Sequence, residues 1–237
     1  MPTDAYAEAR HLMVETQVVS RGMRDPAVLN AMLTVPREAF VIPEYADAAY
    51  EDRPLPIGEE QTISQPYIVA RMTEALRLSA SDRVLEVGTG SGYAAAILSC
   101  IVKRTYTVER IEKLATCARQ RLQALGYLNV HVQYANGTLG WPEHALYDGI
   151  VVAASGPSVP EALKAQLGIG GRLVMPVEVD PSHQQLIRLT RKDDVTYHQE
   201  DLGSVAFVPL IGAQGWEAAR KGAGREQADN LPSEGRG

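Results

Sequence analysis

The chain has 237 residues and carries 23 lysines and arginines against 29 aspartates and glutamates, a formal net charge of −6. This acidic balance argues against a protein that binds nucleic acid by phosphate neutralisation. Apolar residues make up 45% and charged residues 22%, as in soluble globular proteins with a sizeable core.

The first 80 residues predict helices around an irregular segment. Apolar spacing predicts a helix over 5–20, and Asp25 is placed to cap a second helix that starts at Pro26 and ends before Pro36. Prolines between 35 and 65 predict an irregular segment wrapped over the body. Pro66 begins a third helix, over 67–78.

Strands and helices alternate from residue 81 onward. Strands are expected at 84–87, 104–108, 130–134, 148–153 and 172–176, with helices at 93–101, 111–125 and 160–167. This alternation predicts an α/β fold with a doubly wound, mostly parallel sheet. After residue 176 the pattern favours antiparallel strands at 185–190, 195–199 and 204–210. The polar stretch 218–237 lacks the apolar residues that offset ordering entropy, and it predicts a mobile tail.

A glycine-rich loop follows the first strand of this alternating region. Gly88, Gly90 and Gly92 stand at alternate positions between a buried strand and a helix, where the backbone turns sharply and approaches a ligand closely. A dinucleotide fingerprint needs a small residue where this chain has Tyr93, so a nicotinamide oxidoreductase is disfavoured. The preceding Glu86 favours S-adenosylmethionine, and a tight turn without a ligand is the remaining alternative.

Two further residues at strand ends support a nucleoside site. Glu109 ends the next strand, where a carboxylate accepts both hydroxyls of a ribose. Asn136 follows the third strand, and its amide is able both to donate to and to accept from an adenine edge. A simple Asn-Gly turn at Asn136 and Gly137 is an equal alternative.

The sequence now resembles the protein-L-isoaspartate O-methyltransferase family. The matching stretches are 35–41, 55–58, 61–66, 84–93, 125–127, 140–143 and 170–177, and the resemblance runs from about residue 10 to Trp216. It implies a Rossmann-like methyltransferase fold with a modified order of C-terminal strands. It also implies methyl transfer from S-adenosyl-L-methionine to the α-carboxylate of L-isoaspartyl residues, which starts repair of damaged proteins and peptides.

The resemblance also assigns domains and site residues. We expect one methyltransferase domain over 1–217, with a helical and covering segment (1–80), a cofactor-binding core (81–180) and C-terminal strands (181–217). Ser64 corresponds to the active-site serine of the family, although a serine just before Pro66 also suits a helix cap. The expected cofactor-binding residues are Thr62, Ile63, Glu86, Gly88, Thr89, Gly90, Ser91, Gly92, Glu109, Arg110, Asn136 and Gly137.

One departure from the family pattern is clear. The family usually has Gly-Asp-Gly, with the aspartate on the adenine amino group, where this chain has Ala135, Asn136 and Gly137. Asn136 keeps an amide oxygen but loses the charge, which leaves cofactor affinity open. Two alternatives follow: a methyltransferase for a specific aspartate of a peptide or protein, and a catalytically impaired cofactor-binding relative.

The remaining expectations concern partners and location. The scattered histidines and the two cysteines, Cys100 and Cys117, form no metal-ligand spacing, so we expect no metal. We expect a cytoplasmic protein, because the amino terminus lacks a signal-peptide pattern and no apolar run reaches the ~20 residues of a membrane helix. We also expect a monomer. The expected partners are isoaspartyl-containing proteins and peptides, without nucleic acid or membrane.

Overall fold

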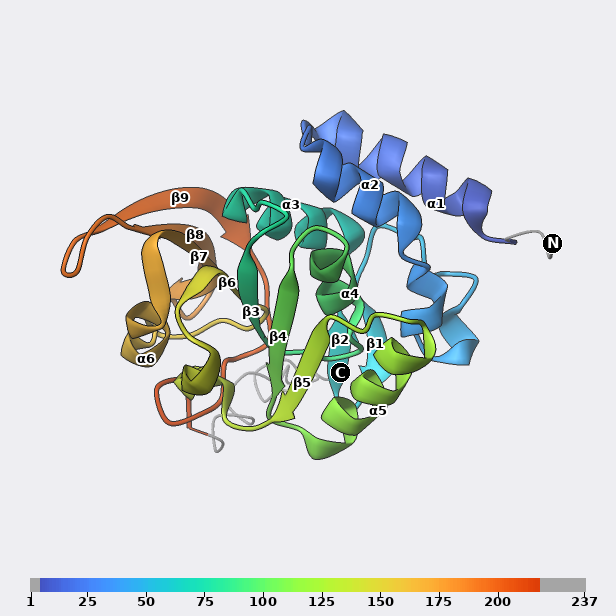
Figure 1. Ribbon diagram of the computed structural model, residues 1–237. Helices are drawn as coiled ribbons and strands as arrows, with labels where there is room; N and C mark the ends of the chain where they lie inside the picture. Colours follow the sequence, from blue (N-terminus) through green and yellow to red (C-terminus); the bar gives the residue numbers. More distant parts are fainter. Residues whose placement is uncertain (1–4, 218–237) are drawn as a thin grey trace, which may run out of the picture.

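The computed structural model describes residues 5–217, so the predicted mobile tail lies outside the described residues. A seven-stranded sheet in the order β5-β4-β3-β6-β7-β8-β9 forms its centre, and β1 pairs with β2 in a separate hairpin (Figure 1). The strands are β1 (Leu55–Gly58), β2 (Gln61–Ile63), β3 (Arg83–Val87), β4 (Arg104–Glu109), β5 (Val130–Tyr134), β6 (Tyr147–Val152), β7 (Leu167–Asp180), β8 (His183–Arg191) and β9 (Tyr197–Val205).

Six α-helices surround the sheet in this part of the chain. They are α1 (Ala7–Met13), α2 (Pro26–Thr34), α3 (Pro66–Leu76), α4 (Tyr93–Ser99), α5 (Glu112–Ala124) and α6 (Glu161–Ala165). The predicted helix over 5–20 is α1 continued by a π-helical turn, Val14–Val18, and a 3₁₀ turn, Val19–Arg21. Asp25 caps α2 as predicted, because its side chain accepts hydrogen bonds from the backbone N–H groups of Ala27 and Val28.

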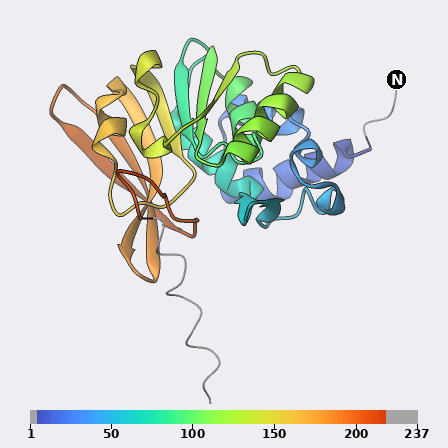
Figure 2. The same cartoon turned by 90° about the horizontal axis from the view of Figure 1, so that it is seen from below.

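The mixed sheet explains the sequence pattern. β3, β4, β5, β6 and β7 are parallel, whereas β8 and β9 run antiparallel. Successive side chains of a strand point to opposite faces, so Val84 joins the core under the N-terminal helices while Leu85 joins the core shared with α6. Both faces of the central strands are therefore buried, and β6 ends in three consecutive apolar residues, Ile150, Val151 and Val152. Figure 2 shows the N-terminal helices at the opposite end of the molecule from β8 and β9.

The order of the strands places a switch point beside β3. The chain passes from β3 through α4 to β4 and through α5 to β5, and then returns to the other side of β3 as β6. Open α/β sheets bind ligands outside the carboxyl ends of strands at such a point. The carboxyl ends of β3, β4 and β6 therefore define where a site is expected.

Two parts of the sequence prediction were wrong. The segment 35–65 is not wholly irregular, because it contains the β1–β2 hairpin. The strand expected at 204–210 does not exist, since β9 ends at Val205. Beyond β9 the Gln184 side chain accepts a hydrogen bond from the Phe207 N–H at 2.7 Å and donates one to the Phe207 carbonyl at 3.1 Å. A side chain thus satisfies the backbone groups of Phe207 that a neighbouring strand would otherwise bond.

Candidate active site

The glycine loop turns the chain from β3 into α4. Gly88, Gly90 and Gly92 have φ values of 97°, 53° and 91°, in the left-handed region that side chains with a Cβ rarely adopt. A Cβ at Gly90 would lie 3.2 Å from the Ile57 side chain of β1, which closes over the loop. The loop therefore presents bare backbone to the pocket that lies beneath the hairpin.

Glu109, at the end of β4, fastens this loop. One carboxylate oxygen accepts a hydrogen bond from the Gly90 N–H at 2.9 Å, and the other accepts from the Ile111 N–H at 3.0 Å. Each oxygen of an ionised carboxylate has a second lone pair, so both remain able to accept from a ligand hydroxyl. Glu109 thus combines a fixed position with free acceptor capacity at the pocket wall.

Glu86 lies on the floor of the pocket in a chain of hydroxyl groups. The Thr107 hydroxyl donates to a Glu86 carboxyl oxygen at 2.5 Å and shares a second hydrogen bond with the Thr89 hydroxyl, 2.6 Å away. Burial, with a smaller contribution from the charge of Glu109 and against the Thr107 hydrogen bond, raises the pKa of Glu86 to about 8. Glu86 is mostly protonated at neutral pH and adds little charge to the floor.

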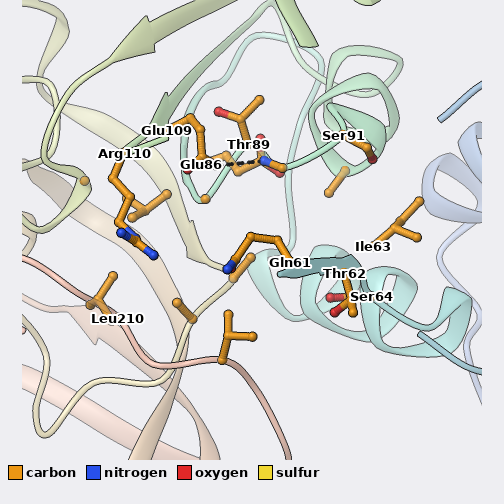
Figure 3. A pocket seen from close by; sticks show the side chains of 18 of the residues that line it. Gln61, Thr62, Ile63, Ser64, Glu86, Thr89, Ser91, Glu109, Arg110 and Leu210 are labelled. Atoms are coloured by element: carbon orange, nitrogen blue, oxygen red, sulfur yellow. Dashed lines mark hydrogen bonds between the residues drawn. The ribbon is translucent and has the colours of Figure 1, made fainter. Parts of the chain in front are cut away.

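Ser64 lies directly after β2, where the covering segment over the pocket (residues 55–65, which include the β1–β2 hairpin) meets α3. The helix begins at Pro66, so its cap position is held by Gln65 and not by Ser64. No side chain makes a capping hydrogen bond there. Within residues 5–217 its hydroxyl forms no hydrogen bond, while its backbone carbonyl accepts one from buried Arg37. Figure 3 shows the Ser64 side chain at the pocket edge, beside Thr62.

The segment 208–211 forms the wall opposite the covering segment. Ser155, after β6, holds it in place, because the Ser155 N–H donates to the Val208 carbonyl and the Leu210 N–H donates to the Ser155 carbonyl, both at 2.8 Å. A second hollow continues from the pocket, and Thr62, Ser64, Ala153 and Val208 line both of them. Ser64 therefore stands where the two hollows meet.

The second hollow has an uncharged lining. It runs between the end of the covering segment and the residues that follow β9. Its wall therefore consists of backbone, uncharged polar groups and apolar side chains. Its lining residues are Pro54, Thr62, Ser64, Gln65, Ile68, Ala153, Ser204, Val205, Ala206, Phe207 and Val208.

Most of the predicted site residues lie together around the first pocket (Figure 3). Gly92 and Asn136 are not among the lining residues: Gly92 begins α4, and the Asn136 amide oxygen accepts from the Thr138 N–H and hydroxyl at 3.1 and 2.8 Å. Asn136 thus serves the turn, which was the alternative expectation. The predicted residues that do line the pocket are Thr62, Ile63, Ser64, Glu86, Gly88, Thr89, Gly90, Ser91, Glu109, Arg110 and Gly137.

Several lining residues were absent from the predicted set. Tyr93, Ala153 and Ala154 come from the start of α4 and the end of β6. The position of Ala153 and Ala154 after a parallel strand was the available signal, because ligands bind at such strand ends. In the part of the chain that the structure describes, no group of three or more His, Cys, Asp or Glu side chains is placed to hold a metal ion, and no helix has the length and apolarity to cross a membrane.

A doubly wound sheet with this glycine loop and an acid at the next strand end is the architecture of S-adenosylmethionine-dependent methyltransferases. The model of the family described as protein-L-isoaspartate(D-aspartate) O-methyltransferase matches residues 8–215. The chain belongs to this family.

Relatives and solved structures agree with this assignment. The chain is 61% identical to "Protein-L-isoaspartate O-methyltransferase 2" of Pelobacter propionicus, over 87% of this chain and 92% of that protein. It is 59% identical to a protein-L-isoaspartate O-methyltransferase of Rhodopseudomonas palustris, over 86% and 94%. A solved protein-L-isoaspartate O-methyltransferase superposes with a TM-score of 0.78 at 30% identity, covering 88% of this chain and 66% of the other.

A second solved structure carries a cofactor product. It is a putative protein-L-isoaspartate O-methyltransferase from Plasmodium falciparum in complex with S-adenosyl-L-homocysteine. Its TM-score is 0.72 at 26% identity, with 86% of this chain and 98% of that chain covered. S-adenosyl-L-methionine is accordingly the cofactor of this family member.

Proposed function

We propose that this enzyme methylates the α-carboxylate of L-isoaspartyl residues in proteins and peptides and so initiates their repair. The family membership of residues 8–215 supports the reaction class. The observation that carries the proposal furthest is the position of Ser64. Its hydroxyl has no hydrogen-bond partner within residues 5–217 and lies where the pocket beside the glycine loop meets an uncharged hollow.

The first pocket suits S-adenosyl-L-methionine. Bare backbone at Gly88 and Gly90 gives room for close approach, and the Glu109 carboxylate has acceptor capacity for ribose hydroxyls. When bound there, the cofactor supplies a methyl group on a positively charged sulfur. The residues assigned to hold it are Thr62, Ile63, Glu86, Gly88, Thr89, Gly90, Ser91, Glu109, Arg110 and Gly137, with Gly92 shaping the loop and Asn136 the adjoining turn.

The methyl-transfer reaction requires alignment of the reacting atoms more than proton transfer. An α-carboxylate has a reference pKa near ~3.5 and is ionised at neutral pH, so it needs no general base. A carboxylate oxygen forms the new bond to the methyl carbon as the bond to sulfur breaks, and the two opposite charges cancel. Holding the reacting atoms in line is worth up to ~7–11 kcal/mol in ideal cases. Ser64 contributes by donating a hydrogen bond to the substrate carboxylate.

The second hollow suits an extended peptide. Its lining has no charged side chain, so it offers recognition of backbone with little preference for the charge of neighbouring residues. A damaged protein segment has to be flexible to enter it. We assign the enzyme to the cytoplasm as a monomer, and the exposed free thiols of Cys100 and Cys117 suit a reducing compartment.

Paired peptides test the reaction. Labelled S-adenosyl-L-methionine is incubated with an isoaspartyl peptide and its aspartyl twin, and base-labile label is counted. We expect label on the isoaspartyl member alone. Label on the aspartyl member alone would favour the specific-aspartate alternative. Absence of label on both with retained cofactor binding would favour the catalytically impaired relative.

The role of Ser64 is tested by Ser64→Ala. Because a hydrogen bond to a charged group contributes about 1.5–3 kcal/mol, we expect kcat/KM for the isoaspartyl peptide to fall roughly 10- to 100-fold. The control is Ser81→Ala, an exposed serine that precedes β3 and should leave kcat/KM unchanged. Wild-type turnover by Ser64→Ala with only a lower melting temperature would remove Ser64 from the mechanism.

A further inference from the structure

Arg37 is a fully buried cation without a carboxylate partner in the described structure. It lies at 0% exposure in the turn Arg37–Phe40, behind the covering segment. Its Nε donates to the Ala49 carbonyl at 2.7 Å and its Nη2 donates to the Ser64 carbonyl at 2.8 Å. Within residues 5–217 its Nη1 has no hydrogen-bond partner.

Glu38, the acidic residue next to Arg37 in the sequence, pairs with other groups. Glu38 pairs with Arg10 at 3.4 Å and accepts a hydrogen bond from the Tyr50 hydroxyl. Burying an unpaired ion costs several kcal/mol, and arginine does not escape this cost by losing its proton. Two carbonyls, the ring and hydroxyl of Tyr93 and the nearby Tyr50 are all neutral groups, so the charge itself needs an explanation.

Arg37 touches two residues of the pocket wall. It holds the Ser64 carbonyl, and its guanidinium carbon lies 4.8 Å from the centre of the Tyr93 ring, within cation–π range. Ser64 and Tyr93 both line the first pocket. The positive charge is therefore separated from the pocket by one layer of protein, in a region where water screens it little.

We propose that Arg37 is a positioning residue that fixes Ser64 through its carbonyl and supplies the positive potential that selects a substrate carboxylate. The inference rests on the proposed function, because it assigns the carboxylate to the side of the pocket where Ser64 lies. Holding the Ser64 carbonyl requires only one neutral hydrogen-bond donor. A purely structural role therefore does not explain why the residue carries a buried positive charge.

The test separates charge from packing with two peptides of one shape. One carries an isoaspartyl residue with its α-carboxylate, and the other carries the neutral α-amide in its place. Binding of both is measured by calorimetry with S-adenosyl-L-homocysteine present, and the ratio of the two Kd values is the readout. Wild-type turnover of the isoaspartyl peptide is measured in parallel, because its absence would reject the proposed function before Arg37 is judged.

Arg37→Gln keeps an amide donor and removes the charge, whereas Arg37→Lys keeps the charge. We expect the preference for the carboxylate peptide to fall about 10-fold in Arg37→Gln, at the effective dielectric constants of about 20 that suit protein sites, and to persist in Arg37→Lys. The Kd of S-adenosyl-L-homocysteine is measured in both variants as well, so that each peptide titration is done with the cofactor site saturated.

The matched control is Arg188→Gln. Arg188 is another buried arginine, 8% exposed, which donates to the Ala75 carbonyl at 3.1 Å and pairs with Glu200. It does not line either hollow, so this variant should lose stability and keep the peptide ratio. If Arg37→Gln fails to fold, citrulline placed at position 37 by nonsense suppression removes the charge at nearly constant shape. An unchanged ratio in the neutral variant that folds, whatever its melting temperature, would overturn the proposal.

Discussion

Replacing Glu86 by glutamine should remove the pH dependence that this buried carboxyl group gives to the free energy of unfolding. Glu86 is 1% exposed, and the Thr107 hydroxyl bonds its carboxylate at 2.5 Å. Burial, together with the nearby charge of Glu109, raises its pKa from an ordinary value of 4.5 to about 8. Glutamine has the same shape, still accepts from Thr107 and does not ionise.

The sign follows from where the proton is held. Between pH 4.5 and about 8 the folded chain keeps a proton on Glu86 that the unfolded chain releases. The free energy of unfolding therefore falls as the pH rises through this window. Each unit of pKa difference corresponds to about 1.4 kcal/mol, so from about pH 5.5 to 8.5 the wild type should lose about 3 kcal/mol relative to Glu86→Gln.

Urea unfolding of both proteins at about pH 5.5, 7.0 and 8.5 measures this difference. The comparison cancels groups that titrate in both proteins, such as His131, whose pKa is lowered by burial. Glu112→Gln, at an exposed position in the first turn of α5, is the control and should differ from wild type equally at each pH. A wild-type minus Glu86→Gln difference that does not change with pH would show that Glu86 is ionised in the folded protein, and the reasoning would fail.

Two further substitutions test the cofactor side. Glu109→Ala leaves the Gly90 and Ile111 N–H groups without their acceptor, so calorimetry should show S-adenosyl-L-homocysteine binding weakened roughly 10- to 100-fold; an unchanged Kd would exclude Glu109 from the site. Asn136→Asp keeps the acceptor for the Thr138 N–H and hydroxyl and lies outside the pocket lining, so the same Kd should change less than about 3-fold. A gain of 10-fold or more would instead place this side chain on the adenine, as the family's aspartate implies.

The order of elements was predictable because the central strands are buried on both faces. The stretch 84–87 is a short strand with apolar residues at three of its four positions, and the glycines after it mark the strand-to-helix turn. The β1–β2 hairpin was not predictable in this way. Its turn places Glu59 and Glu60 at φ values of 51° and 56°, where glycine or asparagine is the usual signal. The ion pair of Glu59 with Lys113 on α5, at 2.8 Å, comes from the tertiary fold.

The candidate site likewise has a part that was predictable and a part that was not. The position of the glycine loop, Glu86 and Glu109 at the pocket was predictable, because strand ends and φ-permissive residues leave local signals in the sequence. Side-chain directions were not predictable: Asn136 bonds the turn at Thr138. The contact between Arg37 and the Ser64 carbonyl spans 27 residues of sequence, and no local pattern records it. Such contacts are set by the packing of the covering segment on the body.

The net charge of −6 poses a problem for an enzyme whose substrate is a carboxylate. Its solution has to be local, since exposed charges beyond about 10 Å are screened at ordinary salt. Of the two acids at the pocket, Glu86 is mostly neutral at pH 7, and Glu109 is tied to two backbone N–H groups. The cations nearby are Arg110 on the lining and Arg37 behind it. The charge balance at the site is therefore less negative than that of the whole chain, and losing the Arg37 charge should disturb recognition more than losing a surface cation.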